Sequence, residues 1–248
     1  MSEAQEIDAI VVGYTDYGES DRIARLISPQ VGLISVMGRS ARRSTHRMSG
    51  IIDLGNQIKA TVRPGKGEIW TLSKASLERG FLNIRNHIHK LALLSYCCEI
   101  SSHFGQDNMP APKLFGLLEH SLTLLDTESG HFAAPFRIGF ELKALSFAGL
   151  QPPLTTCALC GMPSRDEMFY LFNAGGAVHS SCASPSEWSV SLAWLQALDE
   201  ILHAPLKDSV SDKTLNGPLW TIAHHIEHHI EKPLRSRAFL ASLEGTAS

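Results

Sequence analysis

The sequence predicts a multidomain α+β protein, in which a five-stranded β-barrel is followed by an all-α region that carries a metal-binding loop. Three observations predict this. Short apolar segments separated by glycine and proline turns fill the first 80 residues, apolar residues recur at helical spacing after about residue 83, and paired cysteines interrupt the helical pattern. We therefore expect a barrel domain over residues 1–82 and a helical domain over residues 83–248, with the metal-binding loop at about residues 154–186.

The first domain contains five candidate strands. Each is an apolar or alternating run that ends at a turn rich in glycine or proline. The runs cover residues 7–14, 22–28, 32–38, 50–63 and 68–77. Gly55 lies inside the fourth run and would mark a bulge there. Five strands without a convincing helix are typical of a small barrel, and this pattern fits both the OB-fold, which binds oligonucleotides, and an SH3-like barrel.

The second domain shows helical periodicity. Apolar residues recur three or four positions apart in three segments, and Gly149 with the following Pro152-Pro153 pair ends the third. The helical pattern returns after the loop. The predicted helices cover residues 84–98, 114–125, 136–147, 191–202 and 215–231.

The composition excludes several classes of protein. The chain has 248 residues, of which 44% are apolar, so a core can form and wholesale disorder is not expected. No run of about 18 apolar residues occurs, so we expect no membrane span. The start of the chain lacks a basic and apolar secretory signal, and an odd number of cysteines does not suggest a disulfide framework. We therefore expect a cytoplasmic protein.

The loop contains a set of residues with the spacing of metal ligands. Cys157 and Cys160 form a C-x-x-C pair, and His179 and Cys182 form an H-x-x-C pair. Each pair lets two ligands converge on one ion from a tight turn, and two such pairs supply the four ligands of tetrahedral zinc. Because all four positions are filled by the protein, the predicted site is structural. The alternatives are free thiols and a catalytic dithiol, but no thioredoxin-like βαβ pattern surrounds Cys157.

Charge is distributed unevenly along the chain. Residues 22–79 carry 11 basic and 3 acidic side chains, although the net charge of the whole chain is −3. No carboxylate occurs between Asp21 and Asp53. Arginines rich in hydrogen-bond donors suit phosphate contacts, so this stretch predicts a nucleic-acid partner rather than a fold. The candidate DNA-binding residues are Arg39, Arg42, Arg43, Arg47, Arg63 and Lys66.

Few aromatic residues are available in the barrel to stack bases, namely Tyr14, Tyr17, Trp70 and Phe81. Binding should therefore depend mainly on backbone charge, show little sequence preference, and accept both single and double strands. Such a surface suits a protein that brings strands together.

The sequence contains no recognisable catalytic set. No Ser/His/Asp arrangement, phosphate-binding loop or dinucleotide fingerprint occurs. His224, His225, His228 and His229 form i,i+4 pairs, but their order around Glu227 is not that of a zinc protease, and ordinary surface and interface histidines fit better than a second metal site. We therefore expect a protein that is not an enzyme and has no small-molecule substrate.

Several segments together resemble the RecO family of bacterial DNA repair proteins, and they extend over nearly the whole chain. They are Asp16–Ile23, Gly38–Arg43, Phe140–Leu142 with Gly149–Pro152, the Cys157/Cys160/His179/Cys182 set, and Lys232–Ser236. Each match is modest, but their order and spacing are specific.

The resemblance implies an N-terminal OB-fold and a helical domain with one structural zinc ion. It also implies a recombination mediator that anneals complementary DNA strands and, with RecR, helps to load RecA onto single-stranded DNA coated by SSB. Contact with the C-terminal tail of SSB is expected on the helical domain, in an apolar groove edged by a positive charge, for which Arg137 is the candidate. Two alternatives stay open: another zinc-containing RNA-binding or regulatory protein, and a zinc hydrolase that uses the histidines.

Overall fold

The computed structural model describes residues 3–39, 41, 50–65, 67–129, 132, 134–165, 168–183, 188–210 and 215–244. The chain divides into two compact units, here called unit 1 (residues 1–128 and 238–248) and unit 2 (residues 129–237). The predicted domain boundary after residue 82 lies inside unit 1 and stays a prediction. Within the described residues, no helix has both the length and the apolar character that a membrane crossing needs.

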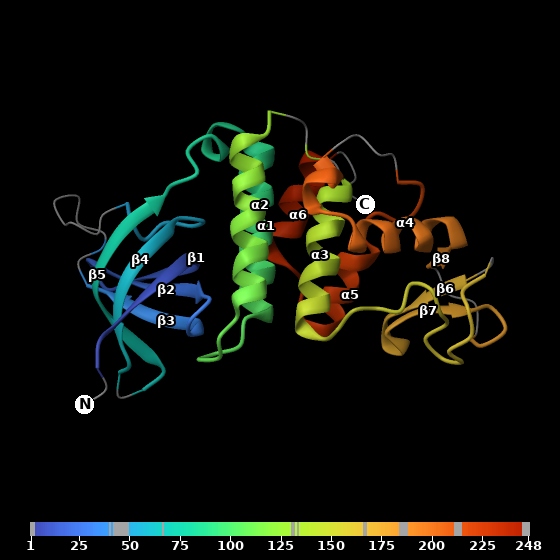
Figure 1. The fold of residues 1–248 in the computed structure, drawn as a ribbon, viewed down its shortest axis with the longest axis horizontal. Helices are drawn as coiled ribbons and strands as arrows, with labels where there is room; N and C mark the ends of the chain where they lie inside the picture. Colours follow the sequence, from blue (N-terminus) through green and yellow to red (C-terminus); the bar gives the residue numbers. More distant parts are fainter. Residues whose placement is uncertain are drawn as a thin grey trace. The chain divides into compact units, whose positions relative to one another are not determined.

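Unit 1 contains the predicted five-stranded barrel (Figure 1). Its strands close in the order β1-β2-β3-β5-β4, with β4 paired to β1, which gives an OB-like barrel. β3 and β5 run parallel, and the other neighbouring strands are antiparallel. The strands are β1 (Gln5–Tyr17), β2 (Asp21–Ser28), β3 (Gly32–Gly38), β4 (Gln57–Arg63) and β5 (Ile69–Arg79).

Alternation along the strands builds the barrel core. Ile7, Ala9 and Val11 of β1 contribute to it, together with apolar residues from the other four strands. The next residue, Ile10, is also fully buried, and so is its partner Ile27 on β2. They are buried because α1 (Ile88–Phe104) and α2 (Pro112–Thr127) pack against these two strands. Burial on both faces explains why β1 reads as a continuous apolar run instead of an alternating one.

The fourth strand is shorter than predicted. It begins at Gln57, and the preceding residues form turns, so Gly55 is not a bulge inside a strand. Gly55 has φ +79°, a left-handed conformation that favours glycine, and a Cβ atom there would lie 2.6 Å from Cδ1 of Leu94. The glycine is therefore required by the close approach of α1. The irregularities in the ladder lie at Val11/Gly13 in β1 and at two points along β4.

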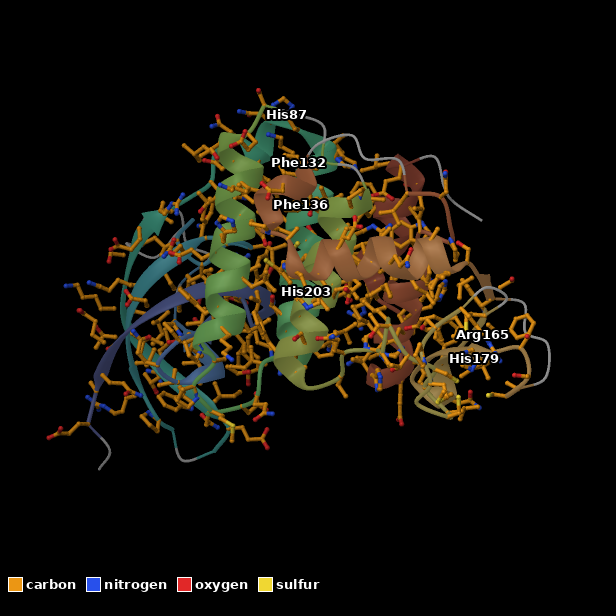
Figure 2. The ribbon with its side chains drawn as sticks, turned by 45° about the vertical axis from the view of Figure 1, so that its right-hand side comes forward. His87, Phe132, Phe136, Arg165, His179 and His203 are labelled. Atoms are coloured by element: carbon orange, nitrogen blue, oxygen red, sulfur yellow. The ribbon has the colours of Figure 1, made fainter. Side chains whose placement is uncertain are left out.

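Unit 2 is mainly helical, as predicted, and contains α3 (Ala134–Ala148), α4 (Leu192–His203) and α5 (Thr221–Ile230). Phe132 and Phe136 form an edge-to-face pair in its core, with centroids 4.8 Å apart (Figure 2). α5 begins six residues later than predicted because Gly217 and Pro218 precede it. The sequence did not predict the helix α6 (Arg235–Leu243), whose residues from Ala238 onward belong to unit 1. Short 3₁₀ helices are η1 (Ile84–Asn86), η2 (Phe172–Ala174) and η3 (Leu206–Val210).

The predicted metal-binding loop contains a small sheet that the sequence did not predict. β6 (Met168–Leu171) pairs with both β7 (Gly176–His179) and β8 (Ser189–Val190) in antiparallel register. The longest of these strands has four residues. A pattern of this length is too short to distinguish from a loop.

Candidate metal centre and nucleic-acid interface

Unit 2 brings all four predicted metal ligands together. The ligand atoms of Cys157, Cys160, His179 and Cys182 lie within 4.8 Å of one another. Cys157 and Cys160 occupy a tight turn, in which the N–H of Gly161 donates to the carbonyl of Cys157 at 2.9 Å and Gly161 has φ +71°. His179 ends β7, and the N–H of Cys182 donates to the His179 carbonyl at 2.9 Å. Two tight turns, closed by hydrogen bonds that span four and three residues, therefore bring the ligand pairs together.

The distances fit a tetrahedral ion. Nδ1 of His179 lies 3.4 Å from Sγ of Cys160 and 3.8 Å from Sγ of Cys182. Zinc–sulfur and zinc–nitrogen bonds of ordinary length, at the tetrahedral angle, place such atoms about 3.6 Å apart. The residues therefore fit one metal ion, and their soft and borderline donors are those that zinc prefers.

Surrounding contacts orient the ligands. Nε2 of His179 lies 3.0 Å from the carbonyl oxygen of Pro163, to which it can donate, and this leaves the lone pair of Nδ1 for the metal. Nη2 of Arg165 donates to Oγ of Ser181 at 3.1 Å and so links the two turns. Figure 2 labels His179 and Arg165 in this part of unit 2.

The backbone also favours the thiolate of Cys157. Burial alone would raise the pKa of this thiol, but hydrogen bonds from the N–H groups of Cys160, His179 and Leu159 lower the pKa to about 6. For Cys182, burial and then the neighbouring cysteines raise the pKa of the thiol. Four protein ligands leave no open position for a catalytic water, so the arrangement can hold a structural ion.

The described part of the predicted DNA-binding surface lies at one rim of the barrel. Arg39 follows the end of β3, Arg63 ends β4, and both are exposed. Strand pairing brings these two positions to the same end of the barrel. Thr71 of β5 pairs with Met37 of β3 on one side and with Arg63 of β4 on the other. Two steps of strand spacing are about 10 Å, so two stretches far apart in sequence reach the same rim. Arg42, Arg43, Arg47 and Lys66 lie outside the described residues.

Arg137 lies in a different environment from the one predicted for it. It is on α3 and is fully buried. Its Nη1 donates to Oε1 of Glu141 at 2.7 Å, its Nη2 donates to the carbonyl of Leu219 at 3.0 Å, and its guanidinium stacks 3.6 Å over the ring of Trp220. The charge is neutralised inside unit 2 instead of lying at the edge of a groove. A role for Arg137 in binding a partner stays a prediction, and these contacts do not favour it.

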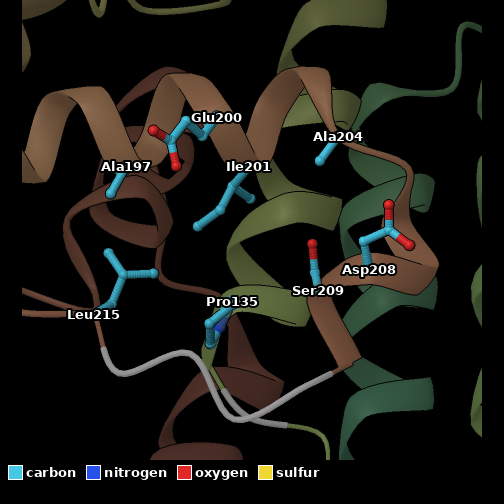
Figure 3. Close-up of a pocket in the computed structure, with 8 residues that line it drawn as sticks. All are labelled: Pro135, Ala197, Glu200, Ile201, Ala204, Asp208, Ser209 and Leu215. Carbon is cyan, nitrogen blue, oxygen red and sulfur yellow. The ribbon is translucent and has the colours of Figure 1, made fainter.

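Two of the surface hollows formed by described residues of unit 2 bear on the predicted partner groove. The larger, of about 430 Å³, is mainly apolar but carries the carboxylates of Glu200 and Asp208 (Figure 3). The smaller, of about 210 Å³, is lined by Lys143, Ser146, Phe147, Gln151, Leu202 and His203. In this smaller hollow, Nζ of Lys143 donates to the carbonyl oxygens of Leu202 and Ala204, and burial lowers the pKa of the Lys143 ammonium.

The histidine-rich helix α5 has packing contacts. Oε2 of Glu227 lies 3.2 Å from Nδ1 of His224, and Oε1 of Glu227 accepts from Nε of Arg237 at 2.7 Å. Nε2 of His225 and Nε2 of His229 lie 3.1 Å apart. Burial, and then the charge of His229, lowers the pKa of His225 to about 4. Of these contacts, the one to Arg237 joins α5 to the following segment, and the interpretation as ordinary surface and interface histidines stays a prediction.

Comparisons with known proteins agree with this arrangement. Residues 1–81 match the family model described as recombination protein O N terminal, and residues 85–238 match recombination protein O C terminal. The chain is 31% identical over 247 residues to a DNA repair protein RecO of Myxococcus xanthus (strain DK1622), covering 97% of this chain and 98% of that protein. It is 32% identical over 244 residues to a DNA repair protein RecO of Anaeromyxobacter dehalogenans (strain 2CP-C), covering 95% of each.

Proposed function

Because the chain belongs to the recombination protein O family, we propose that it is a DNA-binding recombination mediator in DNA repair. It binds single- and double-stranded DNA through the basic barrel and anneals complementary strands. The observation that carries this proposal is the OB-like barrel whose register brings Arg39 and Arg63 to one rim, next to an arginine-rich stretch without carboxylates.

The proposed chemistry is charge neutralisation. Guanidinium groups hold phosphates by paired N–H donors and release the ions condensed around DNA. Two complementary strands held this way repel each other less, so they can pair. Phosphates carry no base identity, which fits a factor that acts on any sequence. Nothing in this mechanism breaks a covalent bond, and we propose that the protein is not an enzyme.

The proposed metal is one structural zinc ion held by Cys157, Cys160, His179 and Cys182. Zinc would supply the folding free energy that short strands and turns lack. We propose that the ion stabilises the fold of unit 2 and does not contact DNA.

We propose protein partners from family membership: RecR, with which the chain would load RecA onto single-stranded DNA coated by SSB. The predicted site for the SSB tail is an apolar groove edged by a positive charge. Of the two hollows described above, we propose the one beside Lys143, because it has a positive charge at its edge and apolar surface from Phe147 and Leu202; its other lining residues are polar, and Nζ of Lys143 also donates to the carbonyls of Leu202 and Ala204. The hollow in Figure 3 does not fit as well, because its charged groups are carboxylates.

Annealing of complementary oligonucleotides coated with SSB tests the proposed function. The wild-type protein should speed annealing, and a variant with Arg39, Arg42 and Arg43 changed to Ala should lose most of this activity. Metal content and thermal unfolding serve as controls and should stay unchanged. A wild-type protein that binds RNA but does not anneal DNA would instead support a zinc-containing RNA-binding or regulatory protein.

A further inference from the structure

We propose that Tyr14, fixed in place by Arg22, is a base-stacking platform that gives the barrel a preference for single strands. The inference rests on the proposed DNA-binding function and adds a specificity-determining residue to it. It starts from two exposed aromatic residues of β1, Tyr14 and Tyr17, of which Tyr14 has an arginine stacked on its ring.

The ring of Tyr14 is held from one side. Cζ of Arg22 lies 3.8 Å from the ring centroid, while 43% of the Tyr14 residue surface is exposed. The strand register explains the contact. Asp16 pairs with Arg22, and Tyr14, two residues earlier on β1, pairs with Ala24 on β2. Tyr14 and Arg22 are therefore diagonal neighbours on the same face of the sheet. Arg22 therefore covers one ring face, while a substantial part of the residue stays exposed, and we infer that a base would stack on the opposite face.

Arg22 is itself fixed. Its Nε donates to Oδ1 of Asp16 at 2.9 Å, and its Nη1 donates to the carbonyl oxygen of Ile52 at 2.9 Å. Both hydrogen bonds lie in the plane of the guanidinium, so its flat face is left to stack on the tyrosine ring. A ring held against a fixed cation loses little conformational freedom when a base binds, which lowers the entropic cost of stacking.

Tyr14 and Arg22 lie near the end of β3, where the arginine-rich sequence from Arg39 onward begins. Arg22 pairs with Gly38, the residue before Arg39, and Ile52 comes five residues after Arg47 in sequence. A strand whose phosphates bind Arg39 would place its bases near Tyr14. Bases in a duplex are already paired and stacked on each other, so only a single strand can use the ring. The platform therefore adds discrimination that phosphate contacts lack.

The test compares three probes of equal length: oligo-dT, an abasic single strand, and a duplex. Wild-type protein should bind oligo-dT roughly 5- to 100-fold more tightly than the abasic strand, since stacking on one aromatic side chain is worth about that factor. Tyr14→Leu should lose this difference and bind the abasic strand and the duplex within about twofold of wild type, whereas Tyr14→Phe should keep it. Leu77→Ala, which alters a residue with 47% exposure on β5, is the matched control and should behave as wild type.

Each result has one meaning. Equal wild-type affinity for oligo-dT and the abasic strand would overturn the stacking proposal but leave DNA binding by the barrel intact. No binding to any probe would overturn the proposed function and this inference with it. An equal loss on all three probes in Tyr14→Leu would show a structural role and overturn stacking. Photocrosslinking of wild-type protein to oligo-dT containing 5-iodouracil does not depend on how the variants fold. The adduct should map to Tyr14, and an adduct only at other residues would overturn the proposal.

Discussion

The barrel and the metal-binding region (residues 154–183) both contain antiparallel strands, but different forces stabilise them. The barrel strands have 7 to 13 residues, close on themselves and bury an apolar core. Strands β6 and β7 have four residues each, and β7 ends at His179, one of the four candidate metal ligands. Sheets this small are marginal unless other elements or ligands support them. The comparison teaches that a closed apolar core stabilises the strands of unit 1, whereas the short strands of unit 2, although several of their side chains are also buried, are expected to need metal binding in addition.

Metal removal should produce the largest difference in stability between the metal-binding region and the barrel. Structural zinc sites carry apparent binding free energies of about 10–16 kcal/mol, more than the whole stability of most domains. We expect chelation to remove hydrogen-exchange protection from residues 154–183, including the amide of Ala158, which donates to the Ala177 carbonyl at 2.8 Å. The strands of the barrel should keep their protection.

A Cys160→Ser variant purified with and without added zinc provides the control, since it should behave like chelated wild type in both cases. Equal loss of protection in the barrel would show that the two regions do not fold independently and would end the comparison.

A cavity in the barrel core should destabilise the barrel and leave the metal-binding region unchanged. Leu26 is fully buried in the core, so Leu26→Ala should lower the free energy of unfolding of unit 1 by about 2–5 kcal/mol. Metal content should remain at the wild-type value because Leu26 is on β2, in the other unit. Denaturant unfolding and metal analysis measure both quantities. Leu77→Ala, at an exposed site, should change stability by no more than about 0.5 kcal/mol.

Acid should weaken unit 2 through His225. Its folded pKa of about 4 lies below the ordinary value of 6.5, so the unfolded chain binds more protons between these values. The contribution of the neutral His225 to the free energy of unfolding is therefore fully present above about pH 6.5 and is lost as the pH falls towards 4. We expect a loss of about 2 kcal/mol between about pH 7 and pH 5.

Urea unfolding followed by a unit 2 probe measures this loss, and His225→Gln should reduce it. His203→Gln, at an exposed histidine, is the control and should leave the pH dependence unchanged. An equal pH dependence in wild type and His225→Gln would assign the effect to other groups.

The sequence predicted those features whose signal is local. Each barrel strand carries its own apolar pattern, and the spacing of Cys157 and Cys160 shows two ligands in one turn. Features that depend on distant partners were missed. Arg137 was assigned to a surface, because the Leu219 carbonyl that it binds lies 82 residues away. The contact between Tyr14 and Arg22 depends on the register of two strands, and Gly55 depends on Leu94. Only Glu141, four residues after Arg137, offered a local signal of that buried ion pair.

The variant with the smallest expected change in stability tests where DNA binds. Arg42 and Arg43 lie in the stretch without carboxylates, so changing both to Ala should flatten the slope of log affinity against log salt by roughly 1 to 2 units. The loss should be similar for unrelated sequences, because phosphates carry no base identity. Stability should change by no more than about 0.5 kcal/mol, and metal content should not change. A double variant at Lys113 and Lys207, two exposed lysines outside the barrel strands, removes the same charge and should keep the wild-type slope. An unchanged slope in the arginine variant would move the DNA site away from the barrel, most directly to the basic segment from Lys232 to Arg237. That result would place DNA binding and the metal in the same unit and break the division of roles between the two regions.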